Sequence, residues 1–219
     1  MEPHILTAQK AYWNRHFSQD IAPASARSVW LDELLGQTGR ALEGDVLEIG
    51  CGRGHDTYHL LQAGCRVTCL DLSWNALQNI ARHFPAAQLV HGALPEPLPF
   101  RSATFAYVIA GLSLHYFRWQ DTCAIIREIG RVLQPNGALI FRVNSTEDVA
   151  HGAGRGEEIE PNLFLYEGRY KRFFTEPMCQ QLFDDSWQLE LLTPRVETRF
   201  QETKPTWMGI STRKTPSIS

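Results

Sequence analysis

Short apolar runs alternate with amphipathic segments between residues 45 and 143, and this alternation restricts the folds open to the chain. Five runs have the length and composition of strands: 45–49, 66–70, 87–91, 104–110 and 138–143. Three segments between them have the pattern of helices: 56–63, 73–84 and 119–133. A Pro135-Asn136-Gly137 turn is expected to close the last helix. Strands alternating with helices predict right-handed crossovers and an α/β fold, with helices on both faces of a mainly parallel sheet.

The segments outside this region predict a cover and a closing strand pair. Residues 1–40 read as an N-terminal helical cover, and 145–173 as a polar, glycine-rich substrate loop too long for an ordinary connection. Thr175 is placed to cap a short helix over 175–183. The runs 189–200 and 206–212 predict two final strands, paired antiparallel.

Size and composition favour one ordinary folded unit. The 219 residues suit a single domain, and the contents of 43% hydrophobic and 21% charged residues are average for globular proteins. The net charge of −3 gives no bulk attraction for nucleic acid, and the apolar runs are too short to span a membrane. The N-terminus has no signal-peptide pattern, and five cysteines without a Cys-x-x-Cys pair are expected to be reduced thiols. We therefore expect a cytoplasmic protein with no membrane or nucleic-acid partner.

A strand running into three glycines is the densest motif of the chain. Residues 46–54 read Val-Leu-Glu-Ile-Gly-Cys-Gly-Arg-Gly, which places a sharp turn between the first strand and the next helix. A dinucleotide site prefers Gly-x-Gly-x-x-Gly, whose helix N-terminus receives a pyrophosphate. Here Glu48 precedes glycines 50, 52 and 54, and an acid is badly placed for a phosphate. The motif therefore favours a ligand that carries positive charge over a nicotinamide site, a flavin site or a plain turn.

Asp71 supplies a second signal at the end of the neighbouring strand. It follows the run Val67-Thr68-Cys69-Leu70 and lies 21 positions after Gly50. This spacing in a βαβ unit puts a carboxylate where it can accept hydrogen bonds from both hydroxyls of a ribose. The alternative is that Asp71 only caps the following helix.

These stretches resemble the class I S-adenosylmethionine-dependent methyltransferase family over about residues 10–145. Glu48-x-Gly50-x-Gly52-x-Gly54 is similar to its first motif, Asp71 to its second, and the stretch 128–138 to the segment before its fifth strand. The resemblance implies a Rossmann-like, seven-stranded, mostly parallel sheet whose last strand is antiparallel. It also implies S-adenosyl-L-methionine as the cofactor, a sulfonium and ammonium ligand without phosphate.

The resemblance and the strand ends together predict the cofactor-binding residues Tyr12, Trp13, Glu48, Gly50, Cys51, Gly52, Gly54, Asp71, Leu72, Ala93, Leu94 and Ala110. Ala93 departs from the family, which usually has an acid there to hold the adenine amino group. Adenine is then expected to rely on backbone groups near Ala93 and Leu94 and on apolar packing. Tyr12 and Trp13 have two open readings: aromatic faces beside the sulfonium, or core packing.

The acceptor side is less well marked. His115 and Tyr116 follow the fourth strand, and they either orient or deprotonate a nucleophile or simply line the pocket. With Asn144 and Arg172, they are the predicted substrate-binding residues. No catalytic residue is assigned, because an activated methyl donor needs mainly an in-line nucleophile. His55 and His59 share a helix face but lack a third ligand, so no metal is expected.

The sequence thus predicts an enzyme that transfers a methyl group from S-adenosylmethionine to a small-molecule acceptor. Two alternatives stay open. One is methylation of a macromolecule, for which a cluster of basic and aromatic residues would be expected. The other is a cofactor-binding sensor or non-catalytic partner subunit, which the missing acid at Ala93 would suit.

Overall fold

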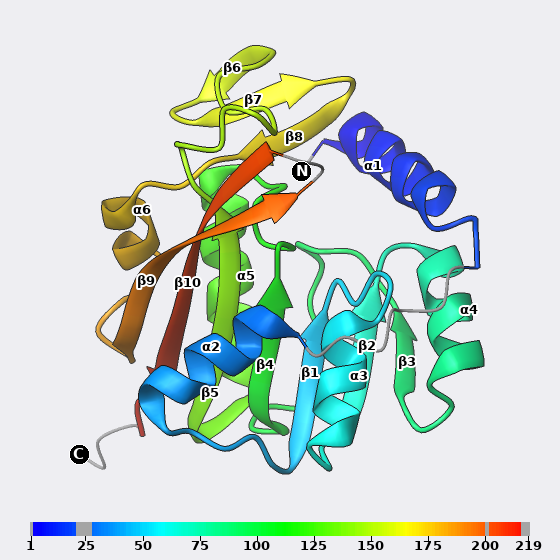
Figure 1. Ribbon diagram of the computed structural model, residues 1–219, viewed down its shortest axis with the longest axis vertical. Coiled ribbons are helices and arrows are strands. Elements are labelled where there is room, and N and C mark those ends of the chain that lie inside the picture. Colours follow the sequence, from blue (N-terminus) through cyan, green and yellow to red (C-terminus); the bar gives the residue numbers. More distant parts are fainter. Residues whose placement is uncertain (1, 21–27, 200–201, 216–219) are drawn as a thin grey trace.

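A seven-stranded sheet in the order β3-β2-β1-β4-β5-β10-β9 organises the protein (Figure 1). The computed structural model describes residues 2–20, 28–199 and 202–215. The strands of this sheet are β1 Asp45–Ile49, β2 Arg66–Asp71, β3 Gln88–His91, β4 Phe105–Gly111, β5 Leu133–Asn144, β9 Trp187–Arg199 and β10 Glu202–Arg213. The helices are α1 Pro3–His16, α2 Val29–Thr38, α3 His55–Gln62, α4 Trp74–His83, α5 Trp119–Val132 and α6 Glu176–Gln181. No helix in these described ranges has the length and apolar character needed to cross a bilayer.

The strand directions confirm the predicted fold class. Strands β3, β2, β1, β4 and β5 pair in parallel, whereas β10 runs antiparallel to both β5 and β9. The last strand of the chain is therefore inserted as the antiparallel member of a Rossmann-like sheet. The parallel strands all end at one edge, where a ligand of such a sheet binds.

Two hydrophobic cores cover the two faces of the sheet. Ile140 of β5 belongs to the core that includes Leu31 of α2 and Leu60 of α3. Its neighbour Phe141 points to the opposite core, which includes Ile126 of α5. This alternation follows from the two-residue period of a strand, and Figure 1 shows α2 and α3 on one face with α5 on the other.

Helix caps and turns agree with the sequence at several points. The Thr175 side chain accepts a hydrogen bond from the Met178 N–H and caps α6, as predicted, and the Ser73 hydroxyl accepts the Ala76 N–H and caps α4 in the same way. The turn expected at residues 135–137 lies inside β5, where the pairing with β4 is irregular and Asn136 has a φ of 62°. The fifth strand therefore begins at Leu133, earlier than expected.

The predicted substrate loop over 145–173 is wrong in its second half. Residues 157–172 form a three-stranded antiparallel sheet, built from β6 Glu157–Glu160, β7 Leu163–Tyr166 and β8 Arg169–Arg172. Leu163 and Tyr170 are buried in a small third core with Ile5 of α1. These few apolar residues form a core because Ile5 of α1 packs against them from the other side. The polar composition of the segment could not indicate this contact with a distant helix.

Candidate functional site

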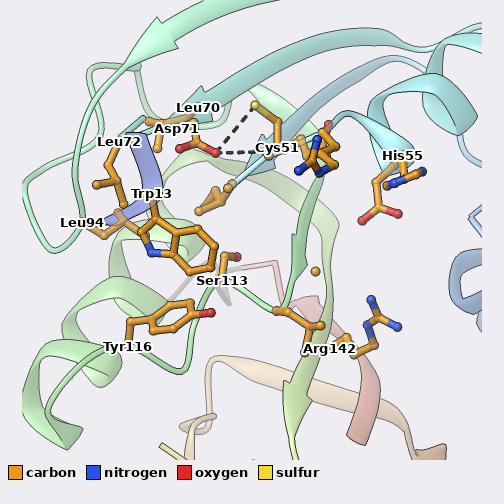
Figure 2. Close-up of a pocket in the computed structure, with 18 of the residues that line it drawn as sticks. Trp13, Cys51, His55, Leu70, Asp71, Leu72, Leu94, Ser113, Tyr116 and Arg142 are labelled. Carbon is orange, nitrogen blue, oxygen red and sulfur yellow. Dashed lines mark hydrogen bonds between the residues drawn. The ribbon is translucent and has the colours of Figure 1, made fainter. Parts of the chain in front are cut away.

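A cavity of about 480 Å³ lies at the carboxyl ends of the parallel strands. The residues lining it come from α1, the start of α2, the glycine loop after β1, and the ends of β2, β4, β5 and β9. Figure 2 shows Trp13, Asp71, Tyr116 and Arg142 around it. The site therefore gathers residues from nearly the whole length of the chain at the expected edge of the sheet.

The glycine loop needs glycine for both its backbone angles and its packing. Gly50 and Gly52 have φ values of 76° and 50°, in the left-handed region that side chains rarely adopt. The Gly50 N–H donates to the Leu70 carbonyl oxygen at 2.7 Å, which fastens the loop to β2. A Cβ atom at Gly50 would lie 2.7 Å from the Ser113 Cβ, closer than real contacts allow. The loop can therefore sit directly against the segment that follows β4.

Asp71 braces the glycine loop from the end of β2. Its Oδ2 accepts the Gly52 N–H at 3.0 Å and its Oδ1 accepts the Ser73 N–H at 2.8 Å. Burial raises the pKa of this carboxyl although these backbone N–H groups lower it. Both interpretations of Asp71 therefore have a basis: it supports the start of α4, and its remaining lone pairs border the cavity.

Glu48 is the second buried acid of the site. Its side chain borders the cavity, is only 3% exposed, and its Oε2 accepts the Thr57 hydroxyl at 2.5 Å. Burial, followed by the nearby Cys69 and Asp56, raises the pKa of Glu48 well above its ordinary value. A buried acid of this kind ionises most readily when a positively charged group enters beside it.

The Ser113 hydroxyl also marks a position where a ligand can bind in the cavity. Among the described residues, the buried Ser113 Oγ has no hydrogen-bond partner, and Ser113 lines the cavity. Buried polar atoms are normally paired, so an orphan in a cavity marks a position for a ligand or for water. Together with the glycine cradle and Glu48, it fits a polar ligand that carries positive charge.

Helix α1 forms the cover of the cavity. The Gln9 Nε2 donates to the Tyr116 carbonyl oxygen at 3.2 Å, and Asn14 Oδ1 accepts the Ser73 hydroxyl at 3.0 Å. The ring of Trp13 stacks on Phe17, with centroids 5.7 Å apart, and meets Tyr116 edge-on at 5.6 Å. These contacts hold α1 over the opening, with Trp13 lining the cavity.

The end of the cavity beside β5 and β9 is charged. Arg142 lies 5.2 Å from the ring centroid of Trp30, and its Nη1 donates to the Glu197 Oε2 at 3.1 Å. Arg195 also donates to this Glu197 oxygen. No sequence signal indicated these residues, because α2, β5 and β9 are distant from one another in the chain and the residues belong to no motif.

Eight of the twelve predicted cofactor residues line the cavity: Trp13, Glu48, Gly50, Cys51, Gly52, Asp71, Leu72 and Leu94. The structure does not bring Tyr12, Gly54, Ala93 and Ala110 to it. Tyr12 faces Arg169, whose guanidinium lies 3.5 Å from the ring centroid. A Cβ at Gly54 would lie 2.5 Å from Ile80, so this glycine serves the packing of α3 on α4. Ala110 is fully buried in the core, and the Ala93 carbonyl accepts the Glu96 N–H.

Only Tyr116 of the four predicted acceptor residues borders the cavity. His115 is 1% exposed, and burial followed by Lys171, Lys204 and Arg142 lowers its pKa well below the ordinary value.

Asn144 and Arg172 are equally buried and have structural contacts. Asn144 Oδ1 accepts a hydrogen bond from Lys204 at 3.0 Å. Arg172 donates to Glu160 at 2.5 Å and to the Pro161 carbonyl oxygen at 3.0 Å. The expectation that these side chains lie on the acceptor surface is therefore corrected, because Asn144 pairs with Lys204 of β10 and Arg172 binds residues 160 and 161 of the small sheet, away from the cavity wall.

Known sequences similar to this chain include several methyltransferases. Residues 46–137 match the family model described as a methyltransferase domain. An uncharacterized methyltransferase of Synechocystis sp. is 38% identical over 92 residues, which are 42% of this chain and 43% of that protein. A malonyl-[acyl-carrier protein] O-methyltransferase of Pseudescherichia vulneris is 32% identical over 115 residues, or 50% of this chain and 43% of that protein. The chain thus spans less than half the length of these curated relatives.

Similar solved structures cover more of the chain and show its fold. The Burkholderia thailandensis 1,6-didemethyltoxoflavin-N1-methyltransferase, solved with 1,6-didemethyltoxoflavin and S-adenosylhomocysteine, has a TM-score of 0.66 at 20% identity. That likeness covers 98% of this chain and 92% of the other. The N-methyltransferase NodS of Bradyrhizobium japonicum, solved with S-adenosylhomocysteine, has a TM-score of 0.68 at 15% identity over 95% of this chain and 100% of its own. Residues 46–137 are therefore similar to a methyltransferase domain, and the chain as a whole shares its fold with these methyltransferase structures.

Proposed function

We propose that the protein transfers a methyl group from S-adenosylmethionine to a small-molecule acceptor. The observation that carries this proposal is the meeting of the glycine loop, Glu48 and Asp71 around one cavity at the sheet edge. Bound S-adenosylmethionine supplies an activated methyl group. Asp71 accepts hydrogen bonds from its ribose, and Glu48 offsets its positive charge. The family usually has an acid at the position of Ala93. In this protein Leu72 and Leu94 pack against the adenine instead.

The acceptor lies on the β4–β5 side of the same cavity. Tyr116 and Ser113 border this side from the segment after β4, and Trp13 closes it from α1. A cavity of about 480 Å³ is the size of a small-molecule site and must also hold the cofactor. The similar Burkholderia enzyme was solved with a small-molecule ligand, which supports the same class of acceptor. The task of these side chains is to hold the acceptor's nucleophile in line with the methyl group.

Calorimetry with S-adenosylmethionine and S-adenosylhomocysteine tests the cofactor site. We expect the wild type to bind both ligands and Asp71→Asn to bind them about 1–3 kcal/mol more weakly, because a ligand hydrogen bond loses its charged acceptor. Asp45→Asn is the control, because Asp45 pairs with Arg66 at 2.7 Å at the opposite end of β1. Its binding should equal that of the wild type.

The remaining outcomes separate the alternatives. If the wild type binds neither ligand, the proposed function is wrong. If it binds both but methylates no member of a broad panel of small amines, alcohols, thiols and carboxylic acids, the sensor or partner-subunit hypothesis replaces it. Methylation of a macromolecular substrate alone would retain the chemistry and overturn the proposed acceptor class.

A further inference from the structure

Two arginines share one glutamate at the charged end of the cavity. Arg142 of β5 and Arg195 of β9 both donate to the same oxygen of Glu197, and all three side chains line the cavity. These three residues bring two guanidinium groups and one carboxylate to this end of the cavity, and the Asp56 carboxylate, which binds the Trp30 indole, also lines the cavity. Glu33 also pairs with Arg195, at 2.6 Å, but is not among the residues lining the cavity.

A guanidinium pair of this kind suits a planar anion. Arginine presents its N–H donors in a rigid fork that matches the two oxygens of a carboxylate. The Glu197 side chain already shows that a carboxylate fits between these two arginines. It enters from β9, the edge strand of the sheet, and retains 24% exposure.

Both arginines have other partners that hold them in position without Glu197. Arg142 packs over Trp30, whose indole N–H is itself fixed by Asp56 at 3.0 Å. Arg195 keeps its ion pair with Glu33. Removing the Glu197 charge therefore leaves both guanidinium groups oriented at the wall of the cavity, with the charge of Arg195 still partly offset by Glu33.

We propose that Arg142 and Arg195 form a carboxylate-binding subsite, which Glu197 fills until the carboxylate of a ligand takes its place. The inference rests on the proposed function, since it concerns the same cavity. Two sources share the required chemistry: a carboxylate on the acceptor and the amino-acid carboxylate of the cofactor. Glu197 acts as a competitor in either case, so removing its charge strengthens binding of the ligand.

Calorimetry on the full chain with Glu197→Gln tests the subsite and separates the two sources. S-adenosylhomocysteine is compared with 5′-methylthioadenosine, an adenosine thioether without the carboxylate. Benzoate is compared with the neutral benzamide on protein saturated with S-adenosylhomocysteine. We expect Glu197→Gln to bind one of the two carboxylate probes about tenfold more tightly, since a competing like charge is removed. The matching neutral probe should bind as it does to the wild type.

Glu190→Gln provides a matched control. Glu190 also lies on β9, pairs with Arg40 at 2.7 Å, has the same 24% side-chain exposure and is not among the cavity-lining residues. It should change no affinity. A gain for S-adenosylhomocysteine assigns the subsite to the cofactor, and a gain for benzoate assigns it to the acceptor.

The subsite is overturned if neither carboxylate probe gains on its neutral partner in folded Glu197→Gln. If that variant fails to fold, Arg142→Gln is measured instead. The proposal requires this variant to bind one carboxylate probe more weakly while the matching neutral probe binds as before. Equal changes in affinity for the carboxylate probe and its neutral partner, in both pairs, would reject the proposal. Failure of the proposed function looks different, because the wild type itself would then bind neither adenosine ligand.

Discussion

Glu48 is the residue whose ionisation depends most on what enters the cavity. Its burial raises its pKa most, and the neighbouring Cys69, Asp56 and Asp71 raise it further, whereas the hydrogen bond donated by Thr57 lowers it. An acid raised in pKa in this way favours its neutral form in the folded, unliganded protein. Acids with a strongly shifted pKa are concentrated at binding and catalytic sites.

Glu48→Gln should stabilise the unliganded protein at neutral pH. The pKa of Glu48 is raised in the folded state, so its contribution is fully favourable below its ordinary value of 4.5 and is lost as pH rises through the folded value. Glutamine mimics the neutral acid at every pH. We expect equal Tm values near pH 4 and a Tm about 2–4 °C higher for the variant at pH 7, equivalent to roughly 1 kcal/mol. A lower Tm at pH 7 would contradict a neutral Glu48.

The glycine loop allows a second test at single positions. Gly50→Ala combines a positive φ with a Cβ that would lie 2.7 Å from Ser113, whereas Gly64→Ala combines a positive φ with open space. The control should cost about 1–2 kcal/mol of unfolding free energy from backbone strain alone. Gly50→Ala should cost more and should also abolish S-adenosylhomocysteine binding in calorimetry. Equal losses in urea unfolding would show that the close approach to Ser113 is unimportant.

Residues in the local motif could be predicted from sequence, whereas those supplied by distant segments could not. The turn at glycines 50 and 52 could be predicted because the spacing of glycines and the backbone angles that they allow are local properties of the sequence. Arg195 reaches the same cavity from β9, which lies beside the rest only after the sheet has formed. Arg172 shows the opposite error, because a basic residue near the expected acceptor is used to bind Glu160 instead.

At the level of elements, the β6–β8 sheet is fixed to the main body by buried polar contacts. The Arg172 side chain is 2% exposed; it donates to Glu160 and to the Pro161 carbonyl oxygen within the small sheet, and its Nε donates to the Phe117 carbonyl oxygen of the segment after β4. Its backbone N–H donates to the His115 carbonyl oxygen at 2.7 Å. One residue thus joins the small sheet to the segment after β4, which borders the cavity.

Arg172→Gln should therefore act on stability. Glu160 keeps Arg118 and the Trp119 N–H as partners, but the partly buried Pro161 carbonyl group loses the guanidinium donor, so we expect the free energy of urea unfolding to fall by about 2 kcal/mol. Arg66→Gln removes an exposed pair with Asp45, since the Arg66 side chain is 72% exposed, and should destabilise the protein much less than Arg172→Gln. Unchanged stability together with a raised KM for an acceptor would restore Arg172 to the substrate surface.

For the whole molecule, the cavity joins parts that otherwise have few contacts. Helix α1 packs on β8 and α4 and covers the ends of strands that belong to the main sheet. The contacts of Gln9 and Asn14 with the segments after β4 and β2 are two of the polar links between this helix and the rest of the protein. A ligand that fills the cavity adds contacts to both sides at once, so it should tighten the cover as well as the loop.

Hydrogen exchange with and without S-adenosylhomocysteine measures this coupling. At a ligand concentration of 100 times Kd, mass action stabilises the folded protein by about 2.7 kcal/mol. We expect the largest gains in protection in α1 and in residues 50–54 and 71–75, because local opening of the cover is closed by the ligand. Strands β6–β8, which have no residue in the cavity wall, should gain only the global effect. Asn14→Ala, which removes the acceptor of the Ser73 hydroxyl, should reduce the gain in α1 while leaving that in 50–54. Protection that rises in the glycine loop but not in α1 would mean that the cofactor binds without the helix, and that α1 is a fixed wall instead of a cover.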